Sequence, residues 1–532
     1  MVLWLGCTVQ TSIDSPTVTV PPPIALHNLV AESSLTHPQW AWTVDGQETA
    51  HTGPIVPARD LWPGQRWTVT AAETNQTVST TVVIPTPTST SVLFVVLDDI
   101  GIDRLALFGL APSPVATPNL DALAAEGVTF DRAWANPTCT PTRASILTGR
   151  HARRTGAGVL IDMSADAWAL SESEWTLPKA IGLSRAAQWR TAAVGKWHLA
   201  GPLAPNWLTH PNRLGFSHFS GSPGYLVVNQ RQDVDGYFRW EKNTNGVLAI
   251  SDTYNTTDIV NDTLDLVSTL PEPFFVYVAF NAAHEPLHVP PAALSSLDVT
   301  DDSSDSDLSN AVTAAFDAEF GRLVEGFSPD LRSRMTIVVV GDNGTPESVM
   351  DPAHFDTDQA KGTIHEGGVR VPLVIAGPMV EAPGRRSDAL VHVVDLYPTL
   401  LDLAAVPVET NPSGHAAVDP GDGSQRSLDG ESLLPLLIDA SAKLERSIGY
   451  TEKFSPNGPA PWNSWARAVR DEAYKLERFE DGKENLHHFV DGGLDEGSDL
   501  LDEPLSDADL IAYERLVAAL DFWDAALVYE GD

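Results

Sequence analysis

Chemically reactive side chains follow four short apolar runs of this sequence, at the points where the runs end. The runs and the residues behind them are 92–97 with Asp98 and Asp99, 191–194 with Lys196 and His198, 274–280 with His284, and 336–340 with Asp342 and Asn343. Short continuous apolar runs are typical of strands buried in a parallel sheet, and ligands bind beyond the carboxyl ends of such strands. We therefore expect these acids, amide, lysine and histidines to meet at one sheet edge.

Oxygen donors form one part of this set. Carboxylate and amide oxygens are hard ligands, which suit Ca²⁺ better than Zn²⁺. The donors in question are Asp98, Asp99, Asp342 and Asn343. They predict a Ca²⁺ site, with Mg²⁺ as the alternative because both ions accept the same donors.

Cys139 lies in a second reactive segment, Cys139-Thr140-Pro141-Thr142-Arg143, which continues to Leu147-Thr148-Gly149-Arg150. A free cysteine is most often a small buried apolar residue. Arg143 follows Cys139 by four residues, about one helical turn. If a helix begins at the motif, Arg143 points back toward Cys139 and the helix N-terminus faces any anion bound there.

The scaffold for these residues is predicted by the pattern of the chain. From residue 92 onward, short apolar runs, among them 371–375, alternate with helical patterns at 119–126, 395–404 and 509–519. This alternation predicts an α/β fold, a large mixed and mostly parallel sheet flanked by helices.

The Cys139 motif with its Leu-Thr-Gly-Arg extension resembles the signature of type I, formylglycine-dependent sulfatases of the alkaline phosphatase superfamily. Thr142 stands where the family more often has Ser. Segments 117–124, 361–372 and 392–400 are also similar to family segments, and the resemblance runs from Ser91 to about Phe522. It implies an alkaline-phosphatase-like sulfatase fold with a small carboxyl-terminal α+β subdomain, in which Leu486-His487-His488-Phe489 replaces the usual Leu-Tyr-Asp-Leu.

The resemblance also implies how each site residue acts. Cys139 would be oxidised to formylglycine by a formylglycine-generating enzyme, and one hydroxyl of its hydrate would attack sulfur while the other later expels sulfate. The implied metal ligands are Asp98, Asp99, modified Cys139, Asp342 and Asn343. The implied catalytic groups are Arg143, which supports the diol, Lys196 and Lys361, which hold sulfate oxygens, Asp342, which assists deprotonation, His198, which promotes release of sulfate, and His284, which protonates the leaving oxygen. The two histidine roles could be exchanged.

Hydrolysis of an aryl or carbohydrate sulfate is the leading functional hypothesis. A phosphonate monoester hydrolase or phosphodiesterase of the same superfamily is the first alternative. A non-catalytic surface lipoprotein that binds glycans is the second. The partners implied by the leading hypothesis are a sulfated small molecule or saccharide and the maturing enzyme.

Acidic residues dominate the charge of the 532-residue chain, whose net charge is −38. This excess excludes binding to a nucleic-acid backbone, which requires dense Lys and Arg. The acidic stretches 298–307 and 491–509 are expected to be exposed loops or polar helix faces. The charge also disfavours polysulfated glycans, unless Arg150, Arg153 and Arg154 make the pocket rim basic. The loop 221–225 is expected near the pocket, while His151, His288, His365 and Trp197 are expected to pack.

Changes in composition and residue pattern divide the chain into five segments. They are a signal remnant, lipobox and linker at 1–21, an immunoglobulin-like or PKD-like β-sandwich at 22–84, a Pro/Thr/Ser linker at 85–91, the catalytic domain at 92–440 and the carboxyl-terminal subdomain at 441–532. Leu5-Gly6-Cys7 resembles a lipobox, so Cys7 is either a lipid anchor or a chance match. We expect a periplasmic or extracellular protein, with membrane anchoring through Cys7 as an option. Two cysteines exclude a disulfide framework.

Overall fold

The computed structural model describes most of the chain after the amino-terminal segment. The described residues are 18–19, 29–33, 35, 38–56, 65–73, 76–83, 91–110, 115–184, 188–229, 233–353, 355–406, 409–411, 414–418, 425–489 and 494–529. Cys7, and with it the predicted lipid anchor, lies outside these residues, as does most of the predicted linker. No helix among the described residues is long and apolar enough to cross a membrane.

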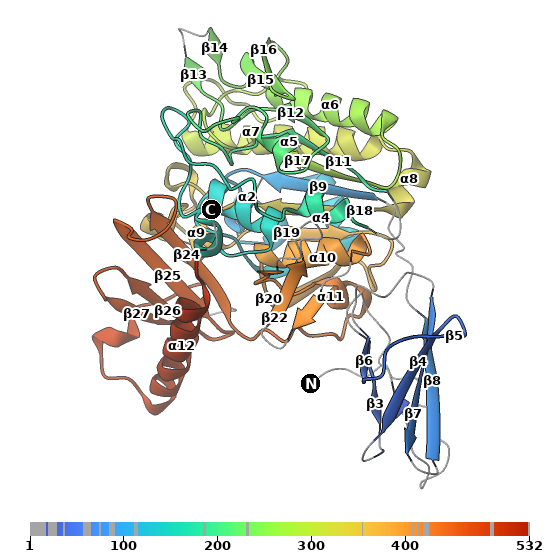
Figure 1. Ribbon diagram of the computed structural model, residues 1–532. Helices are drawn as coiled ribbons and strands as arrows, with labels where there is room; N and C mark the ends of the chain where they lie inside the picture. Colours follow the sequence, from blue (N-terminus) through green and yellow to red (C-terminus); the bar gives the residue numbers. More distant parts are fainter. Residues whose placement is uncertain are drawn as a thin grey trace.

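A ten-stranded mixed sheet forms the centre of the molecule (Figure 1). Its strands, in spatial order, are β16 (Val247–Ser251), β15 (Trp240–Thr244), β12 (His218–Gly221), β11 (Arg190–Gly195), β17 (Phe274–Ala279), β9 (Ser91–Leu97), β18 (Met335–Gly341), β19 (Leu373–Ala376), β10 (Gly127–Trp134) and β20 (Arg385–His392). The run from β12 to β18 is parallel throughout. The predicted mixed, mostly parallel α/β sheet is thereby confirmed.

One strand has the opposite direction to the one its pattern favoured. The apolar run at 371–375 was predicted with the parallel strands, but β19 is antiparallel to both β18 and β10. All four of its residues are buried. A strand covered on both faces is a continuous apolar run in either direction, so the pattern carries no information about direction.

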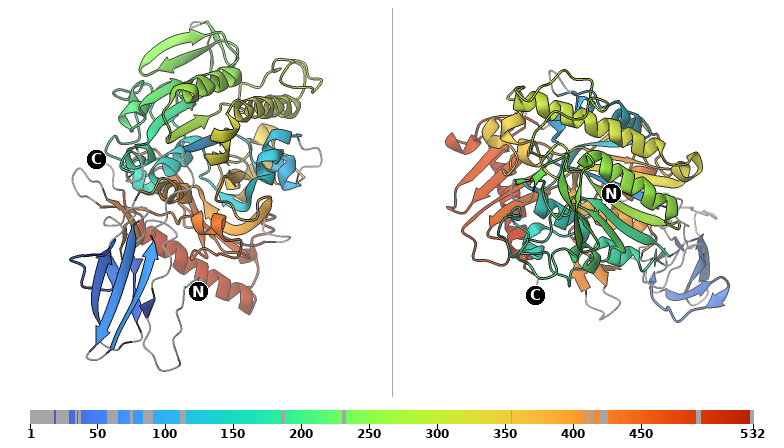
Figure 2. Two further views of the ribbon diagram at one scale, coloured as in Figure 1. Left: turned by 90° about the vertical axis from the view of Figure 1, so that its right-hand side faces the viewer. Right: turned by 90° about the horizontal axis from the view of Figure 1, so that it is seen from above.

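Two cores lie on the two faces of the sheet. Alternate residues of β9 enter different cores, because successive side chains of a strand point to opposite faces: Val92, Phe94 and Val96 lie in one core, and Leu93, Val95 and Leu97 in the other. The first core is covered by α2 (Cys139–Thr148), α4 (Leu177–Ile181) and α10 (Leu396–Leu403), and the second by α1 (Pro118–Ala125), α6 (Asn255–Thr269) and α7 (Asp305–Glu325). Figure 2 shows α6 and α7 packed along the same side of the sheet.

The amino-terminal segment forms a separate group of antiparallel strands (Figure 1). Its main sheet has the order β5 (Gln47–Glu48), β4 (Gln39–Val44), β7 (Arg66–Glu73) and β8 (Gln76–Val83), beside the pairs β2 (Leu29–Val30) with β6 (Ile55–Val56) and β1 (Val18–Thr19) with β3 (Glu32–Ser33). Asp45 and Gly46 form the turn between β4 and β5, both with positive φ. Trp42 and Trp67 are buried in its core, which Ala405 after α10 also joins.

The carboxyl-terminal part is a second antiparallel sheet covered by a long helix. It contains β24 (Gly449–Ser455), β25 (Ser464–Arg470), β26 (Tyr474–Phe479) and β27 (Glu484–His488), with α12 (Asp507–Ala526) packed on β25 and β26. The remaining helices and strands are short: α3 (Ala152–Thr155), α5 (His210–Arg213), α8 (Pro329–Arg334), α9 (Glu366–Val369), α11 (Leu434–Ile438), β13 (Val228–Asn229), β14 (Val234–Asp235), β21 (Glu409–Asn411), β22 (Gly414–Val418) and β23 (Gln425–Ser427).

Candidate active site

The reactive residues predicted from the strand ends converge at one edge of the sheet. β11, β17, β9 and β18 are parallel neighbours, so the residues behind them start from the same edge. Cys139 Sγ lies 3.6 Å from Asp98 Oδ1 and 3.6 Å from Lys196 Nζ. Ligand atoms of Asp98, Asp99, Cys139 and His284 all lie within 4.8 Å of one another.

Helix α2 begins at Cys139, which fulfils the condition under which Arg143 was expected to point back toward Cys139. All ten residues of α2 are buried, and Cys139 is a free cysteine with 1% exposure. Burial, and next the nearby carboxylate of Asp342, raise the pKa of the Cys139 thiol well above its ordinary value. A thiol that stays protonated is a weak nucleophile, so the encoded side chain is poorly suited to attack.

Arg143 lies one turn into α2 and links Cys139 to two strand ends. Its Nε and Nη2 donate to Asp342 Oδ2 at 3.1 and 2.8 Å, and its Nη1 donates to the carbonyl oxygen of Lys196 at 2.9 Å. The guanidinium and the Asp342 carboxylate are both fully buried. Asp342 Oδ1 lies 3.4 Å from the backbone nitrogen of Asp99.

Two lysines neutralise the paired acids that follow β9. Lys196 Nζ donates to Asp98 Oδ2, and Lys361 Nζ donates to Asp99 Oδ1. Burial by itself would raise the pKa of Asp99, but Lys361, His284 and Lys196 outweigh it and hold that pKa well below the usual range. Lys361 lies in a loop that follows β18 in the sequence, so the two cations come from distant parts of the chain.

The donors fit a hard divalent cation. Asn343 Nδ2 donates to Asp99 Oδ1 at 2.8 Å, whereas the buried Asn343 Oδ1 has no hydrogen-bond partner. Burial, and next the carboxylate of Asp98, raise the pKa of Asp342 to about 6. An unpartnered amide oxygen beside three buried carboxylates is a donor set typical of Ca²⁺ or Mg²⁺.

The two histidines differ in their access to the site. His198 has a positive φ of 56°, and its Nε2 lies 2.8 Å from the carbonyl oxygen of Ile161, while its buried Nδ1 has no partner. His284 Nδ1 lies 2.8 Å from the carbonyl oxygen of Glu285, and its Nε2 lies 3.8 Å from Asp99 Oδ2. Burial, and then Lys196, lower the pKa of His284 to about 4. His284 lines a pocket, whereas His198 is 1% exposed and does not.

Tyr225 is a site residue that sequence reasoning did not single out. Its ring stacks on His284 with centroids 5.8 Å apart, and it meets the His198 ring edge-on at 5.5 Å. The loop 221–225 was expected near the pocket, but a single tyrosine in a loop carries no signal of which side chains it will contact.

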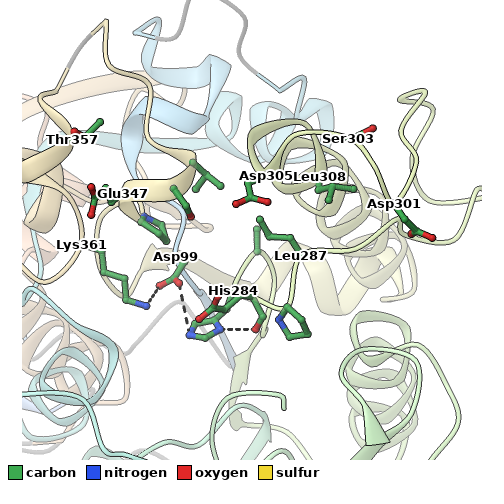
Figure 3. A pocket seen from close by; sticks show the side chains of 16 residues that line it. Asp99, His284, Leu287, Asp301, Ser303, Asp305, Leu308, Glu347, Thr357 and Lys361 are labelled. Carbon is green, nitrogen blue, oxygen red and sulfur yellow. Dashed lines mark hydrogen bonds and ion pairs between the residues drawn. The ribbon is translucent and has the colours of Figure 1, made fainter. Parts of the chain in front are cut away.

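A pocket of 960 Å³ opens beside the acid cluster (Figure 3). Asp99, His284 and Lys361 lie together at one end of it, and Asp301, Asp305 and Leu308 lie at the other. Cys139 and Lys196 are not among its lining residues, because each is covered to 99% by the side chains around it. The pocket therefore reaches the acid cluster from the side of Asp99 and His284.

The three arginines considered for a basic pocket rim do not form one. Arg150 is paired with Glu174, Arg153 with Glu452 and Asp524, and Arg154 with Asp429, and none of the three lines the pocket. All three guanidinium groups are buried. These arginines hold α2 and α3 against neighbouring segments instead of facing a substrate.

His151, His288 and Trp197 pack as expected, whereas His365 does not. His151 contacts the rings of His392, Tyr450 and Trp523, and Trp197 contacts those of Phe216 and Phe219. His288 packs between Tyr237 and Tyr254. His365 instead joins an ionic cluster with Glu477 and Glu496.

Comparisons with known proteins agree on one family. The family model described as Sulfatase matches residues 90–406. N-acetylgalactosamine-6-sulfatase from Sus scrofa is 30% identical over 391 residues, which cover 68% of this chain and 69% of that protein. Arylsulfatase J from Mus musculus is 29% identical over 327 residues, which cover 59% of this chain and 52% of that protein.

Solved structures show the same fold. Ps i-CgsB in complex with k-i-k-neocarrahexaose has a TM-score of 0.66 and 22% identity, and the match covers 82% of this chain and 92% of that one. BT4656 in complex with its substrate D-glucosamine-2-N,6-O-disulfate has a TM-score of 0.60 and 19% identity, with 82% and 98% covered.

Proposed function

This chain belongs to the sulfatase family and is a sulfuric ester hydrolase, and from that premise we propose that it hydrolyses an aryl or carbohydrate sulfate monoester through a formylglycine made from Cys139 on a Ca²⁺ site. The observation that carries the proposal is the position of Cys139, 3.6 Å from both Asp98 and Lys196 at the edge where four parallel strands end. Curated relatives named for aryl and amino-sugar sulfates support the substrate class.

The state of the thiol supports conversion of Cys139. A buried thiol with a raised pKa is protonated at neutral pH and attacks poorly. Oxidation to formylglycine gives a hydrate with one hydroxyl that attacks sulfur and another that releases sulfate, which a thiol cannot provide. Because Cys139 is almost completely buried, we infer that a formylglycine-generating enzyme acts before folding is complete.

The cations around Cys139 suit a sulfuryl group. Lys196 pairs with Asp98 and Lys361 with Asp99, so two cations are available to hold sulfate oxygens. Arg143 positions the Asp342 carboxylate, which accepts the proton of the attacking hydroxyl. The raised pKa of Asp342, about 6, makes this carboxylate a stronger base than an exposed one.

The accessibility of the histidines supports His284 as the proton donor to the leaving oxygen. It lines the pocket through which an alcohol leaves, whereas His198 is enclosed by the loop at Ile161. His284 is neutral at neutral pH in the free site, with a pKa of about 4. A bound sulfate ester brings a negative charge beside its ring, which raises that pKa and favours uptake of the proton.

A divalent cation would be held by Asp98, Asp99, Asp342, Asn343 and the modified Cys139. When bound, Ca²⁺ polarises a sulfate oxygen and fixes the reacting groups, as a hard Lewis acid does. The orphaned Asn343 Oδ1 supports this assignment. Protein treated with a chelator is expected to lose activity and to regain it with Ca²⁺, and Mg²⁺ added in parallel tests the alternative ion.

The deciding experiment combines the mass of the Cys139 peptide with turnover. Protein from a host that has the maturing enzyme should carry an aldehyde at Cys139 and release sulfate from 4-nitrophenyl sulfate, while the folded Cys139→Ala variant should be inactive. An unmodified thiol in fully active protein would overturn the formylglycine mechanism. A phosphodiester assayed in parallel tests the other chemistry: turnover of the phosphodiester orders of magnitude above the sulfate ester would overturn the proposal.

A further inference from the structure

The geometry of the pocket points to a substrate class: we propose that this site selects sulfate esters whose alcohol portion is uncharged or cationic, and rejects alcohols that carry further sulfate or carboxylate groups. The inference rests on the proposed function, because it concerns the leaving-group side of the same site. The proposed substrate class excludes polysulfated glycans, because their binding would require a basic pocket wall.

Four carboxylates besides Asp99 line the pocket. They are Glu285, Asp301, Asp305 and Glu347, and all four are exposed. Figure 3 shows Glu347 and Asp305 on different sides of the cavity, with Asp301 farther out. None of the four forms an ion pair within the described part of the chain. They therefore give the wall a local negative charge.

Lysine and arginine side chains do not neutralise the negative charge of this wall. Among the described residues that line the pocket, Lys361 is the single lysine or arginine, and it is bonded to Asp99. Arg104 lies behind the wall, buried, where it donates to the carbonyl oxygens of Val349 at 2.7 Å and Ser306 at 3.2 Å. Among the described lining residues, the cation thus lies at the sulfate end, whereas the free acids are spread along the wall, with Asp301 and Asp305 at the other end.

The fold fixes two of these acids in place. Asp305 is the first residue of α7, and Asp301 lies in the turn before it. Ser304 caps the helix by accepting the backbone N–H of Asp307 at 3.2 Å, so capping does not require Asp305. Leu287 and Leu308 supply apolar surface between the acids. An apolar floor with an acidic rim suits a ring with hydroxyl or ammonium substituents.

Opposite charges along one pocket orient a substrate. The ester sulfate is drawn to Lys196 and Lys361, and an ammonium on the alcohol is drawn to the acids at the other end. A second anionic group would lie among unpaired carboxylates, and like charges in contact with one another oppose binding. The same side chains therefore attract one end of a zwitterionic substrate and repel a dianionic one.

Three aryl sulfates test the proposal on the mature enzyme. They share one sulfated ring and carry a side arm that ends in an ammonium, an amide or a carboxylate. We expect kcat/KM to fall in that order, by at least about tenfold from the first to the last in low salt. The difference should shrink in 0.5 M NaCl, because salt screens exposed charges.

A matched pair of variants assigns the effect to the wall. In Glu285→Gln/Asp301→Asn/Asp305→Asn/Glu347→Gln, the ratio of kcat/KM for ammonium over carboxylate substrate should approach one. The ratio cancels losses that affect both substrates. The control Glu472→Gln/Glu480→Gln/Glu503→Gln/Glu514→Gln removes the same number of exposed acids outside the pocket and should keep the wild-type ratio. If the first variant does not fold, Asp301→Asn and Glu347→Gln alone should each reduce the ratio by about two- to threefold.

Two results would overturn the inference: an equal or higher kcat/KM for the carboxylate substrate, or a preference that survives removal of all four acids. Failure of the proposed function would look different, since no sulfate ester would then be turned over at all. In that case, calorimetric binding of the same three esters to Cys139→Ala protein still decides the charge preference, by the order of the three Kd values.

Discussion

Arg143 and Asp342 form a fully buried ion pair beside Cys139. Nε and Nη2 of Arg143 both donate to Oδ2 of Asp342. The other oxygen of Asp342, Oδ1, lies near the backbone nitrogen of Asp99. Burial lowers and Asp342 raises the pKa of Arg143, and the net shift is upward, so the guanidinium stays charged. A buried charge lowers the stability of a protein little while its partner is present, and lowers it strongly when the partner is removed.

Removal of the guanidinium should therefore destabilise the protein as well as inactivate it. Arg143→Met leaves the Asp342 carboxylate buried and unpaired, at a cost of about 3–5 kcal/mol in the free energy of unfolding. Arg143→Lys keeps the charge but loses the two-nitrogen geometry, so its loss should be smaller. Urea unfolding in the absence of Ca²⁺ measures both, with Cys139→Ala as the control. Wild-type stability in Arg143→Met would contradict this view of the pair.

At the scale of elements, the chemistry depends on how strands end. Gly195 closes β11 with a positive φ of 96°, and a Cβ built on it would lie 1.9 Å from the carbonyl oxygen of Ala279 in β17. The same carbonyl accepts the backbone N–H of Lys196 at 2.8 Å. Close contact of the two strand ends is thus what brings Lys196 to Asp98.

Gly195→Ala should separate these strand ends. The added methyl group forces β11 away from β17 and displaces Lys196, so we expect a loss of about 3 kcal/mol or more in stability and a fall of at least about a hundredfold in kcat/KM. Gly182→Ala is the matched control, because Gly182 is exposed, has a negative φ and caps the short helix α4. Thermal unfolding and sulfate release measure both variants. A fully active Gly195→Ala protein would show that the contact is dispensable.

At the scale of the whole molecule, the carboxyl-terminal sheet reaches the loop that carries Lys361. His365 Nδ1 lies 2.7 Å from Glu496 Oε2 and 3.0 Å from Glu477 Oε1, and Lys475 Nζ also pairs with Glu496. Burial acts against the charge on His365, but Glu477 and then Glu496 outweigh it and raise the pKa of His365 to about 9. The net effect of Lys475 and His365 lowers the pKa of Glu496 to about 2 despite burial.

This cluster predicts how stability depends on pH. The contribution of Glu496 is complete above its unfolded pKa near 4.5 and is lost as pH falls toward 2. The contribution of His365 is complete below 6.5 and is lost as pH rises through 9. The cluster therefore stabilises most between about pH 4.5 and 6.5.

His365→Gln isolates the alkaline limb of that dependence. The stability difference between wild type and variant should be at most about 3 kcal/mol at pH 5.5 and should approach a constant, smaller value above pH 9. Urea unfolding at pH 5.5, 7.5 and 9.5 measures it. A difference that does not change over this range would contradict the assignment of charge to His365.

We propose that the amino-terminal strands form a module that folds apart from the catalytic part. Its core is built around its own Trp42 and Trp67, and Ala405 is the one residue of the catalytic part in that described cluster. A chain that begins at Ser91 should keep kcat/KM for 4-nitrophenyl sulfate within about twofold, because the site lies at the carboxyl ends of β9, β11, β17 and β18, away from this module (Figure 1). Loss of activity in a folded truncated protein would assign the module a role in the site.

The sequence alone determined the α/β class and the residues of the acid cluster. Each of these depends on local order: a buried strand requires an apolar run, and the residue behind it must lie at the strand's end. Because β9, β11, β17 and β18 are parallel, local order was enough to bring Asp98, Lys196, His284 and Asp342 together.

Tertiary structure decided what depends on contacts between distant segments. The direction of β19, the pairing of Arg150 with Glu174 and the packing of Tyr225 on His284 all required a partner that no local pattern specifies. The acidic stretch 298–307 is exposed, as predicted, but Asp301 and Asp305 also line the pocket. The exposure of an acidic stretch follows from its composition. Which surface its carboxylates face depends on where α7 packs on the sheet. That packing therefore determines the charge of the pocket wall.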